Sequence, residues 1–500
     1  MTFLLAFVLS AAVFLAIRIF PLGSHRERGC DAYYFLMCAR ALREDWQLPI
    51  RLPPKYLAEP EEQWYPPLFP VLIALLPSAW LHRRHWAVNH VLDLAFAGGL
   101  FYMTRHYVGD FGAAATILVY AAQPALVQEF AALTSRPLGM LLQLAAVAAG
   151  YACIIAGSWS AGALAVVAVA LLVYAHKLSL QLLWFLFPFL ALVMGAWEWV
   201  AILVAGYALA GVVWPGFFMK IQRAHIDIVS FWARNWPLLG ANPVRQSPLY
   251  GDGKTKTSYY DSAAVRSAPA FLKTVLQINI FAVFLPLGLV APLQGVPFAD
   301  FLWWWATGIY LWVGATHFVS RLRCLGLAQQ YVKFGYAPVL GFLAIYLQET
   351  ASIWIWFAAA ACVAVQLRWY VLTALALRAE PAIPHSDRLG ELLQFIEAQP
   401  APRIMVFPYH LADELAYRSK AQVLWGTHGY DFERVEPFFP VLQFPLSSLV
   451  NAFGLSHVVL DTNFAAPEEL HLDAARGGKR IGRFIVFKAS DAIAAVDGRT

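Results

Sequence analysis

An aspartate followed by two tyrosines stands in the polar segment after the first apolar run of this chain. The stretch CDAYYFLMCARALRED begins at Cys30, and Asp31, Tyr33 and Tyr34 open it. Apolar and charged positions recur on opposite faces of a helix, which predicts a helix lying at a membrane surface. A carboxylate there could act as a general base on an acceptor hydroxyl. A purely structural interpretation, a capping aspartate with interfacial tyrosines, stays open.

The elements that would position these residues are membrane-spanning. Of the 500 residues, 60% are hydrophobic and only 13% are charged, and the apolar residues form successive runs of roughly 20 residues, the length that crosses a bilayer. We expect a polytopic α-helical membrane protein with about 11–13 transmembrane helices. The first run, Met1 to Phe20, lacks a basic start and a small-residue cleavage site, which predicts a retained helix.

Two long polar segments, residues 21–64 and 219–270, interrupt the apolar runs, and long loops in such proteins often carry function. After residue 380 apolar strand patterns alternate with amphipathic helical ones, as in RIMVF, HVVLD and GRFIVF. This pattern predicts a soluble, parallel α/β domain at 381–500, following a transmembrane domain at 1–380. The sequence contains no glycine-rich nucleotide-binding motif in this region.

Charge and cysteine content narrow the function classes. The net charge of +5 is small for this length and is typical of topology-setting loop charges, so nucleic acid is not an expected partner. The five cysteines form no C-x-x-C pair, and we expect neither a metal site nor a disulfide framework. Pairing of Cys30 with Cys38 would require the helix between them to break.

A second short sequence pattern lies between the first polar segment and the next apolar run. Glu61 and Glu62 precede WYPPLFPVLIALLP, in which a double proline opens an apolar run. Together with the first apolar run, GCDAYYF and the stretch from Asn89 to Ala146, which contains TSRPLG, this order and spacing resembles the first third of the GT-C superfamily of integral-membrane glycosyltransferases. After about residue 160 the resemblance is one of general architecture.

The resemblance implies a polyprenyl-phosphate-linked sugar donor, an acceptor that is a glycan, lipid or protein, and an active site at the extracytoplasmic face of a bacterial inner membrane. By position, Asp31 takes the role of catalytic base. Where many members carry a second acid, this chain has Arg136, which favours a phosphate-binding arginine there. No cofactor is required in this scheme, and a divalent cation stays open without support from the sequence.

Further polar residues near the ends of apolar runs complete the expected substrate site. The motif around Gln330 has a weak resemblance to one found in GT-C-like bacterial proteins. Because a buried phosphate needs charge-assisted donors, we expect some of these cations to hold it; placement by snorkelling and the positive-inside rule is the alternative. The candidate substrate-binding residues are Tyr33, Tyr34, Glu61, Glu62, Arg136, His176, Lys177, Arg321, Gln330 and Lys333.

Two other function classes compete with sugar transfer. A transporter or flippase for a lipid-linked or anionic solute would use the same intramembrane cations, but the sequence has no inverted repeat and no matching pair of broken spans. A catalytically inactive scaffold is the third class; the presence of Asp31 beside the tyrosines counts against it, and the missing second acid counts for it. We therefore predict a membrane glycosyltransferase.

Overall fold

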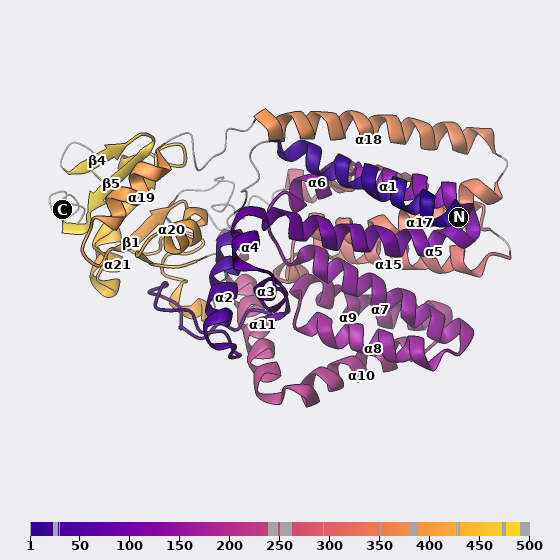
Figure 1. Ribbon diagram of the computed structural model, residues 1–500, viewed down its shortest axis with the longest axis horizontal. Helices are drawn as coiled ribbons and strands as arrows, with labels where there is room; N and C mark the ends of the chain where they lie inside the picture. The colour runs from indigo at the N-terminus through magenta and orange to yellow at the C-terminus, as the bar shows by residue number, and fades with distance from the viewer. Residues whose placement is uncertain are drawn as a thin grey trace. The chain divides into compact units, whose positions relative to one another are not determined.

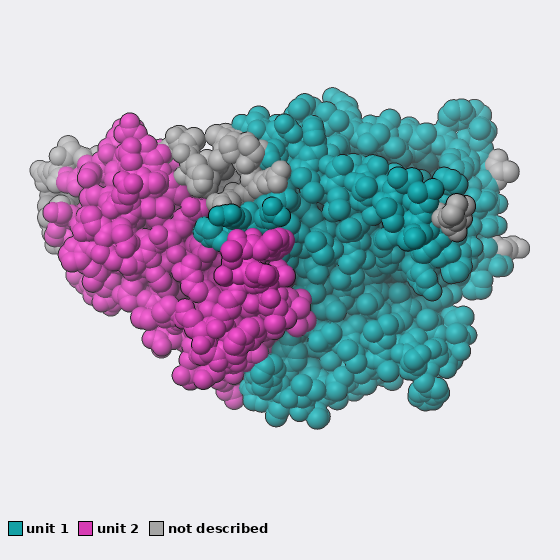
Figure 2. Space-filling model, viewed as in Figure 1, with its two compact units in different colours: residues 1–27, 82–219, 266–380 teal, residues 28–81, 220–265, 381–500 magenta. Residues whose placement is uncertain are grey.

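The computed structural model describes residues 2–23, 29, 31–238, 249–250, 263–293, 295–350, 352–379, 388–426, 428, 431–472 and 477–490. The chain forms two compact units, coloured separately in Figure 2. Unit 1 comprises residues 1–27, 82–219 and 266–380, and unit 2 comprises residues 28–81, 220–265 and 381–500. Residues from both expected loops thus fall in the same unit as the C-terminal region.

Unit 1 is helical, with long helices that run side by side in Figure 1. Its helices are α1 (Thr2–Ile19), α5 (Trp86–Ala121), α6 (Pro124–Phe130), α7 (Arg136–Ala156), α8 (Trp159–Val173), α9 (Lys177–Met194), α10 (Glu198–Val213), α13 (Ala268–Ile278), α14 (Leu287–Val290), α15 (Pro297–Phe318), α16 (Ala328–Val332), α17 (Tyr336–Glu349) and α18 (Ile353–Ala379), with short 3-10 turns between several of them. Helices α4 (Ser78–Arg84), α11 (Pro215–Asn235) and α12 (Ala263–Arg266) cross the boundaries between the units.

Four helices in the described residues are long and apolar enough to cross a membrane, and six spans result if each of two bent helix pairs counts as one. The bent pairs are α5 with α6, at 64°, and α13 with residues 280–290, at 115°. The polytopic helical architecture is confirmed, but fewer helices satisfy these criteria than the 11–13 expected. One reason is that α8 and α10 have only 15 and 16 residues, shorter than the ~20 residues of a typical span.

A buried ion pair joins α1 to α5. Arg18 Nε donates to Asp93 Oδ2 at 2.7 Å, and the Tyr120 hydroxyl donates to Asp93 Oδ1 at 2.6 Å. Both charged side chains are fully buried, and the guanidinium also lies over the rings of Phe14 and Tyr120. Because intramembrane charges are stable only when they are paired, this contact explains why the first helix carries an arginine.

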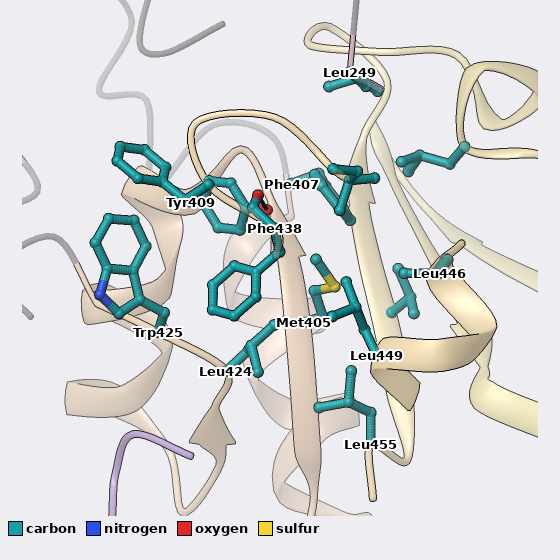
Figure 3. Packing of buried hydrophobic residues seen from close by; sticks show 14 of the residues in the cluster. Leu249, Met405, Phe407, Tyr409, Leu424, Trp425, Phe438, Leu446, Leu449 and Leu455 are labelled. Carbon is teal, nitrogen blue, oxygen red and sulfur yellow. Dashed lines mark hydrogen bonds between the residues drawn. The ribbon is translucent and has the colours of Figure 1, made fainter. Parts of the chain in front are cut away.

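Unit 2 is built around a five-stranded sheet with the order β2-β1-β3-β5-β4. Its strands are β1 (Arg403–Phe407), β2 (Gln422–Val423), β3 (His457–Asp461), β4 (Gly478–Ile481) and β5 (Phe484–Lys488). Its helices are α2 (Asp31–Asp45), α3 (Leu68–Ala74), α19 (Leu389–Glu397), α20 (Ala412–Arg418) and α21 (Leu446–Phe453). Large apolar side chains such as Met405, Phe438 and Leu449 fill the core beside the sheet (Figure 3).

The expectation of a wholly parallel sheet is wrong. β1 pairs in parallel with β2 and β3, but β5 runs antiparallel to β3 and to β4. Ile481 pairs with Phe484, so only Gly482 and Arg483 connect β4 to β5, and a two-residue connection forces antiparallel strands. Gly482 has a φ of +59°, a conformation that glycine adopts without strain.

The first polar segment is part of this sheet unit. Residues 55–58 run alongside β2: Leu57 N donates to Val423 O, and Ala58 N donates to Leu424 O, both at 2.9 Å. The edge of the sheet is therefore covered by chain more than 360 positions earlier in the sequence, an arrangement that also protects an edge strand from aggregation.

Two local expectations are corrected. The apolar run after the double proline, residues 66–80, is expected to span the membrane, but it forms the seven-residue helix α3 and the start of α4 instead. Helix α2 is not half solvated either, because ten of its fifteen residues are buried. Arg43, one of the charged residues of this helix, donates from Nε to Ala74 O at 3.0 Å and so satisfies a carbonyl at the end of α3. Packing by other segments of unit 2 buries faces that the pattern assigns to solvent.

Candidate functional site

Helix α2 presents the predicted base and tyrosines within unit 2. Asp31 is the first residue of α2, and Cys30 lies outside the described residues. Tyr33 is buried, and its hydroxyl accepts a hydrogen bond from Arg418 Nη2 at 2.9 Å. Burial, together with nearby Glu414, raises the pKa of Tyr33, so this hydroxyl stays protonated at neutral pH and remains a hydrogen-bond donor.

Tyr34 is held from two sides. Its hydroxyl donates to Gln63 Oε1 at 3.1 Å, and its ring stacks on His428, with centroids 4.5 Å apart. The stacking ties α2 to a loop near the end of β2. Tyr33 and Tyr34 are therefore rigidly positioned by packing rather than exposed as interfacial anchors.

Glu59, a residue that our sequence reasoning missed, is buried beside α2. Its Oε1 accepts from the backbone N–H of Gly426 at 2.8 Å, while Tyr56 donates to Asp413 Oδ1 at 2.7 Å. Burial raises the pKa of Glu59 to about 8, an effect that the Gly426 hydrogen bond opposes and the Asp413 charge reinforces. At neutral pH the Glu59 carboxyl is therefore predominantly protonated in the native state.

This shift predicts pH-dependent stability. The native state keeps a proton that an unfolded glutamate releases near pH 4.5, so Glu59 lowers stability increasingly from pH 4.5 to about 8, by about 1.4 kcal/mol per pH unit. Glu59→Gln keeps the acceptor for Gly426 and removes the titration. Its melting temperature, followed from pH 5 to 8, should fall less steeply than that of the wild type.

The exposed Glu44 of α2 offers the matched control. Glu44→Gln should leave the pH slope unchanged, and equal slopes for wild type and Glu59→Gln would show that Glu59 does not titrate in this range.

The acids before the double proline have different surroundings. Glu61 is exposed, and its backbone carbonyl accepts from Leu52 N at 2.9 Å. Glu62 forms an ion pair with Lys220 and accepts from Trp64 Nε1 at 3.2 Å. Partial burial favours the neutral acid, but Lys220 outweighs it and lowers the pKa of Glu62. The Glu62 pairing is a structural role that requires no substrate.

In unit 1, two of the predicted cations meet on one acid. Glu129, at the end of α6, pairs through Oε1 with Arg136 Nε at 2.8 Å and through Oε2 with Lys333. The Arg136 contact has poor hydrogen-bond geometry, and Arg136 Nε and Nη1 are buried with no hydrogen-bond acceptor in the described residues. We call Glu129, Arg136 and Lys333 the cation triad. Its Arg136 has N–H groups that are available to a further hydrogen-bond acceptor.

The start of α9 lies against the start of α7. A Cβ added at Gly139 would lie 2.5 Å from His176 Cβ, so glycine permits this close approach. His176 Nδ1 lies 2.8 Å from Ser179 Oγ and accepts from Ser179 N; it caps α9, which accounts for this histidine without a ligand. The side chain of Lys177 forms no ion pair or hydrogen bond with the described residues.

The remaining candidates follow α15. Arg321 is exposed in the 3-10 turn formed by residues 320–325. Gln330 is partly exposed on α16, three residues before Lys333. The structure thus brings Arg136 and Lys333 together and leaves Arg321 on the surface. Within the described residues, no three His, Cys, Asp or Glu side chains gather in a way that would hold a metal.

Comparison with known proteins gives a fold relationship. No family model matches the chain, and no curated protein does either. Among solved structures, ArnT from Cupriavidus metallidurans in the apo state has a TM-score of 0.60 at 13% identity, covering 97% of this chain and 98% of that one.

Two further structures agree. The same ArnT bound to undecaprenyl phosphate has a TM-score of 0.59 at 15% identity, covering 96% of this chain and 97% of that chain. The Archaeoglobus fulgidus oligosaccharyltransferase tethered with an acceptor peptide has a TM-score of 0.59 at 11% identity, covering 97% and 74%. The chain therefore shares its fold with ArnT and with this oligosaccharyltransferase, the kind of fold that the resemblance to the GT-C superfamily predicts.

Proposed function

We propose that this protein is a membrane glycosyltransferase that moves a sugar from a polyprenyl-phosphate donor to an acceptor hydroxyl. The observation that carries the proposal is the fold, which matches ArnT over nearly the full length of both chains. The ArnT structure with undecaprenyl phosphate supports the donor class, and the oligosaccharyltransferase with its acceptor peptide supports an acceptor that is a second, separate substrate.

The proposed reaction assigns one role to the carboxylate and another to the cations. Asp31 takes the proton from the acceptor hydroxyl as its oxygen bonds to the anomeric carbon of the sugar. The bond from that carbon to the phosphate oxygen breaks, and the polyprenyl phosphate leaves with the electron pair. Arg136 and Lys333 hold the phosphate and stabilise the charge that develops on it. We place the reaction at the extracytoplasmic face of a bacterial inner membrane, in assembly of the cell envelope.

Transfer of radiolabelled sugar from a panel of synthetic polyprenyl-phosphate sugars, with candidate glycan, lipid and protein acceptors, tests the proposal. Turnover by the purified protein is the expected result. Donor binding without turnover across the whole panel would instead favour the transporter or scaffold.

The phosphate assignment makes a separate prediction. Arg136→Ala and Lys333→Ala should each weaken donor binding by about 10- to 100-fold, since each removes a charge-assisted contact worth roughly 1.5–3 kcal/mol. Equilibrium binding of a polyprenyl-phosphate sugar in detergent measures this. Lys273→Ala, an exposed cation on α13, is the control and should bind as the wild type does. An unchanged affinity in either triad variant would remove that residue from the phosphate site.

A further inference from the structure

The cation triad contains an acid that phosphate binding by itself does not explain. Glu129 uses its two carboxylate oxygens on two different cations, Arg136 and Lys333, which lie 197 residues apart in sequence. All three side chains are largely buried, with exposed fractions between 11% and 20%. In such surroundings charge interactions are screened less than at a surface. The negative charge of Glu129 therefore weakens the binding of any anion to the same two cations.

The charges of the donor and of the product show which of the two this weakening affects more. Arg136 and Lys333 contribute two positive charges, and Glu129 cancels one of them. A sugar–phosphate–lipid donor is a phosphodiester with a single negative charge, whereas the phosphate that leaves after transfer is a monoester with a charge of about −1.5 to −2 at neutral pH. Two uncompensated cations would therefore favour the product over the donor, and the leaving lipid phosphate would dissociate slowly.

The unpaired N–H groups of Arg136 also indicate that a phosphate can bind beside Glu129. Arg136 Nε and Nη1 are buried without a hydrogen-bond acceptor in the described residues, although the carboxylate of Glu129 is 2.8 Å from Nε. Buried guanidinium donors are costly to leave unpaired. A tetrahedral phosphate offers acceptors in more directions than one carboxylate, and can engage these N–H groups while Glu129 stays near.

We propose that Glu129 is a positioning residue that acts as an internal counterion of the phosphate site. It holds Arg136 and Lys333 together when no phosphate is bound, and it limits how tightly the leaving polyprenyl phosphate is retained. This inference rests on the proposed function, because it takes the phosphate to bind these two cations.

The first test is equilibrium binding of undecaprenyl phosphate to detergent-solubilised protein. Glu129→Gln removes the negative charge at nearly constant shape, and should bind this probe about tenfold or more tightly than the wild type. In the transfer assay the same variant should show a lower KM together with a lower kcat, because product release slows. Glu129→Asp keeps the charge and should stay close to the wild type in affinity.

A double variant separates the electrostatic role from mere support. If Glu129 balances charge, Glu129→Gln combined with Lys333→Ala should bind undecaprenyl phosphate more tightly than Lys333→Ala alone and close to the wild type. If Glu129 only holds the two cationic side chains in position, the double variant should bind undecaprenyl phosphate no more tightly than Lys333→Ala, and this result would overturn the inference. Glu349→Gln, an exposed glutamate at the end of α17, is the control and should match the wild type.

The outcomes distinguish this inference from the proposed function. A wild-type protein that does not bind undecaprenyl phosphate would overturn both. A wild type that binds it, with Glu129→Gln binding equally or more weakly, would overturn the counterion role and leave the phosphate assignment standing. Thermal melting of every variant beforehand confirms that binding is compared between folded proteins.

Discussion

Asp31→Asn is expected to lower the rate of sugar transfer by about 10²- to 10⁴-fold, the usual contribution of a positioned general base. The substitution keeps the size and shape of the side chain and removes its ability to accept the acceptor's proton. Because the proposed donor contacts come from Arg136 and Lys333 rather than from α2, the affinity for the polyprenyl-phosphate sugar should stay within about threefold of the wild type. Transfer of radiolabelled sugar and donor binding, measured on the same preparation, give both quantities.

Asp45 provides the matched control for this variant. It is an exposed aspartate at the opposite end of the same helix, where it accepts from Gln47 N at 3.0 Å. Asp45→Asn should transfer sugar at the wild-type rate. The role of Asp31 at the helix start contributes at most about 1 kcal/mol through the helix dipole, so Asp31→Asn should still fold and insert. Full activity in Asp31→Asn would remove Asp31 from the role of base.

The largest expected effect on stability comes from Asp93→Leu. This variant leaves the Arg18 guanidinium buried without its carboxylate partner and deprives Tyr120 of its acceptor. Removing one partner of a buried ion pair typically costs about 3–5 kcal/mol. We expect a clear fall in the melting temperature of the detergent-solubilised protein, together with a lower yield of folded protein from membranes.

Two comparisons test the cause of that loss. Arg18→Leu combined with Asp93→Leu removes both charges and should recover much of the stability, since it leaves no buried unpaired ion. Asp110→Asn breaks a partly exposed ion pair in which Arg105 Nε lies 3.6 Å from Asp110 Oδ1. This variant should lose only about 0–1 kcal/mol of folding stability. If the double variant is no more stable than Asp93→Leu, loss of packing rather than an orphaned charge is responsible.

Much of the architecture follows from local sequence pattern. Long apolar runs specify membrane-spanning helices because a helix satisfies its own backbone groups in lipid, and α7, α9 and α18 lie where such runs predict spans. Periodicity likewise predicts α19, β1, β3, α21 and β5. The sequence pattern does not indicate strand β4, because its sequence GKRI is short and polar. It is a strand because the following turn folds it onto β5, and a window of four residues cannot reveal that contact.

Some residues of the candidate site can likewise be identified from the sequence, whereas the contacts between them cannot. The sequence alone singled out Asp31, Tyr33 and Tyr34, because residue type and order carry that signal over a few positions, and it flagged Arg136 and Lys333 as cations near the ends of apolar runs. Only the tertiary structure joined these two cations through Glu129 and buried Glu59 against Gly426. Arg136 and Lys333 are 197 positions apart in the chain, and Glu59 and Gly426 are 367 positions apart. The charge balance around Glu129 and the pKa of Glu59 depend on burial and on partners brought together by folding, and neither quantity is encoded in the neighbouring sequence.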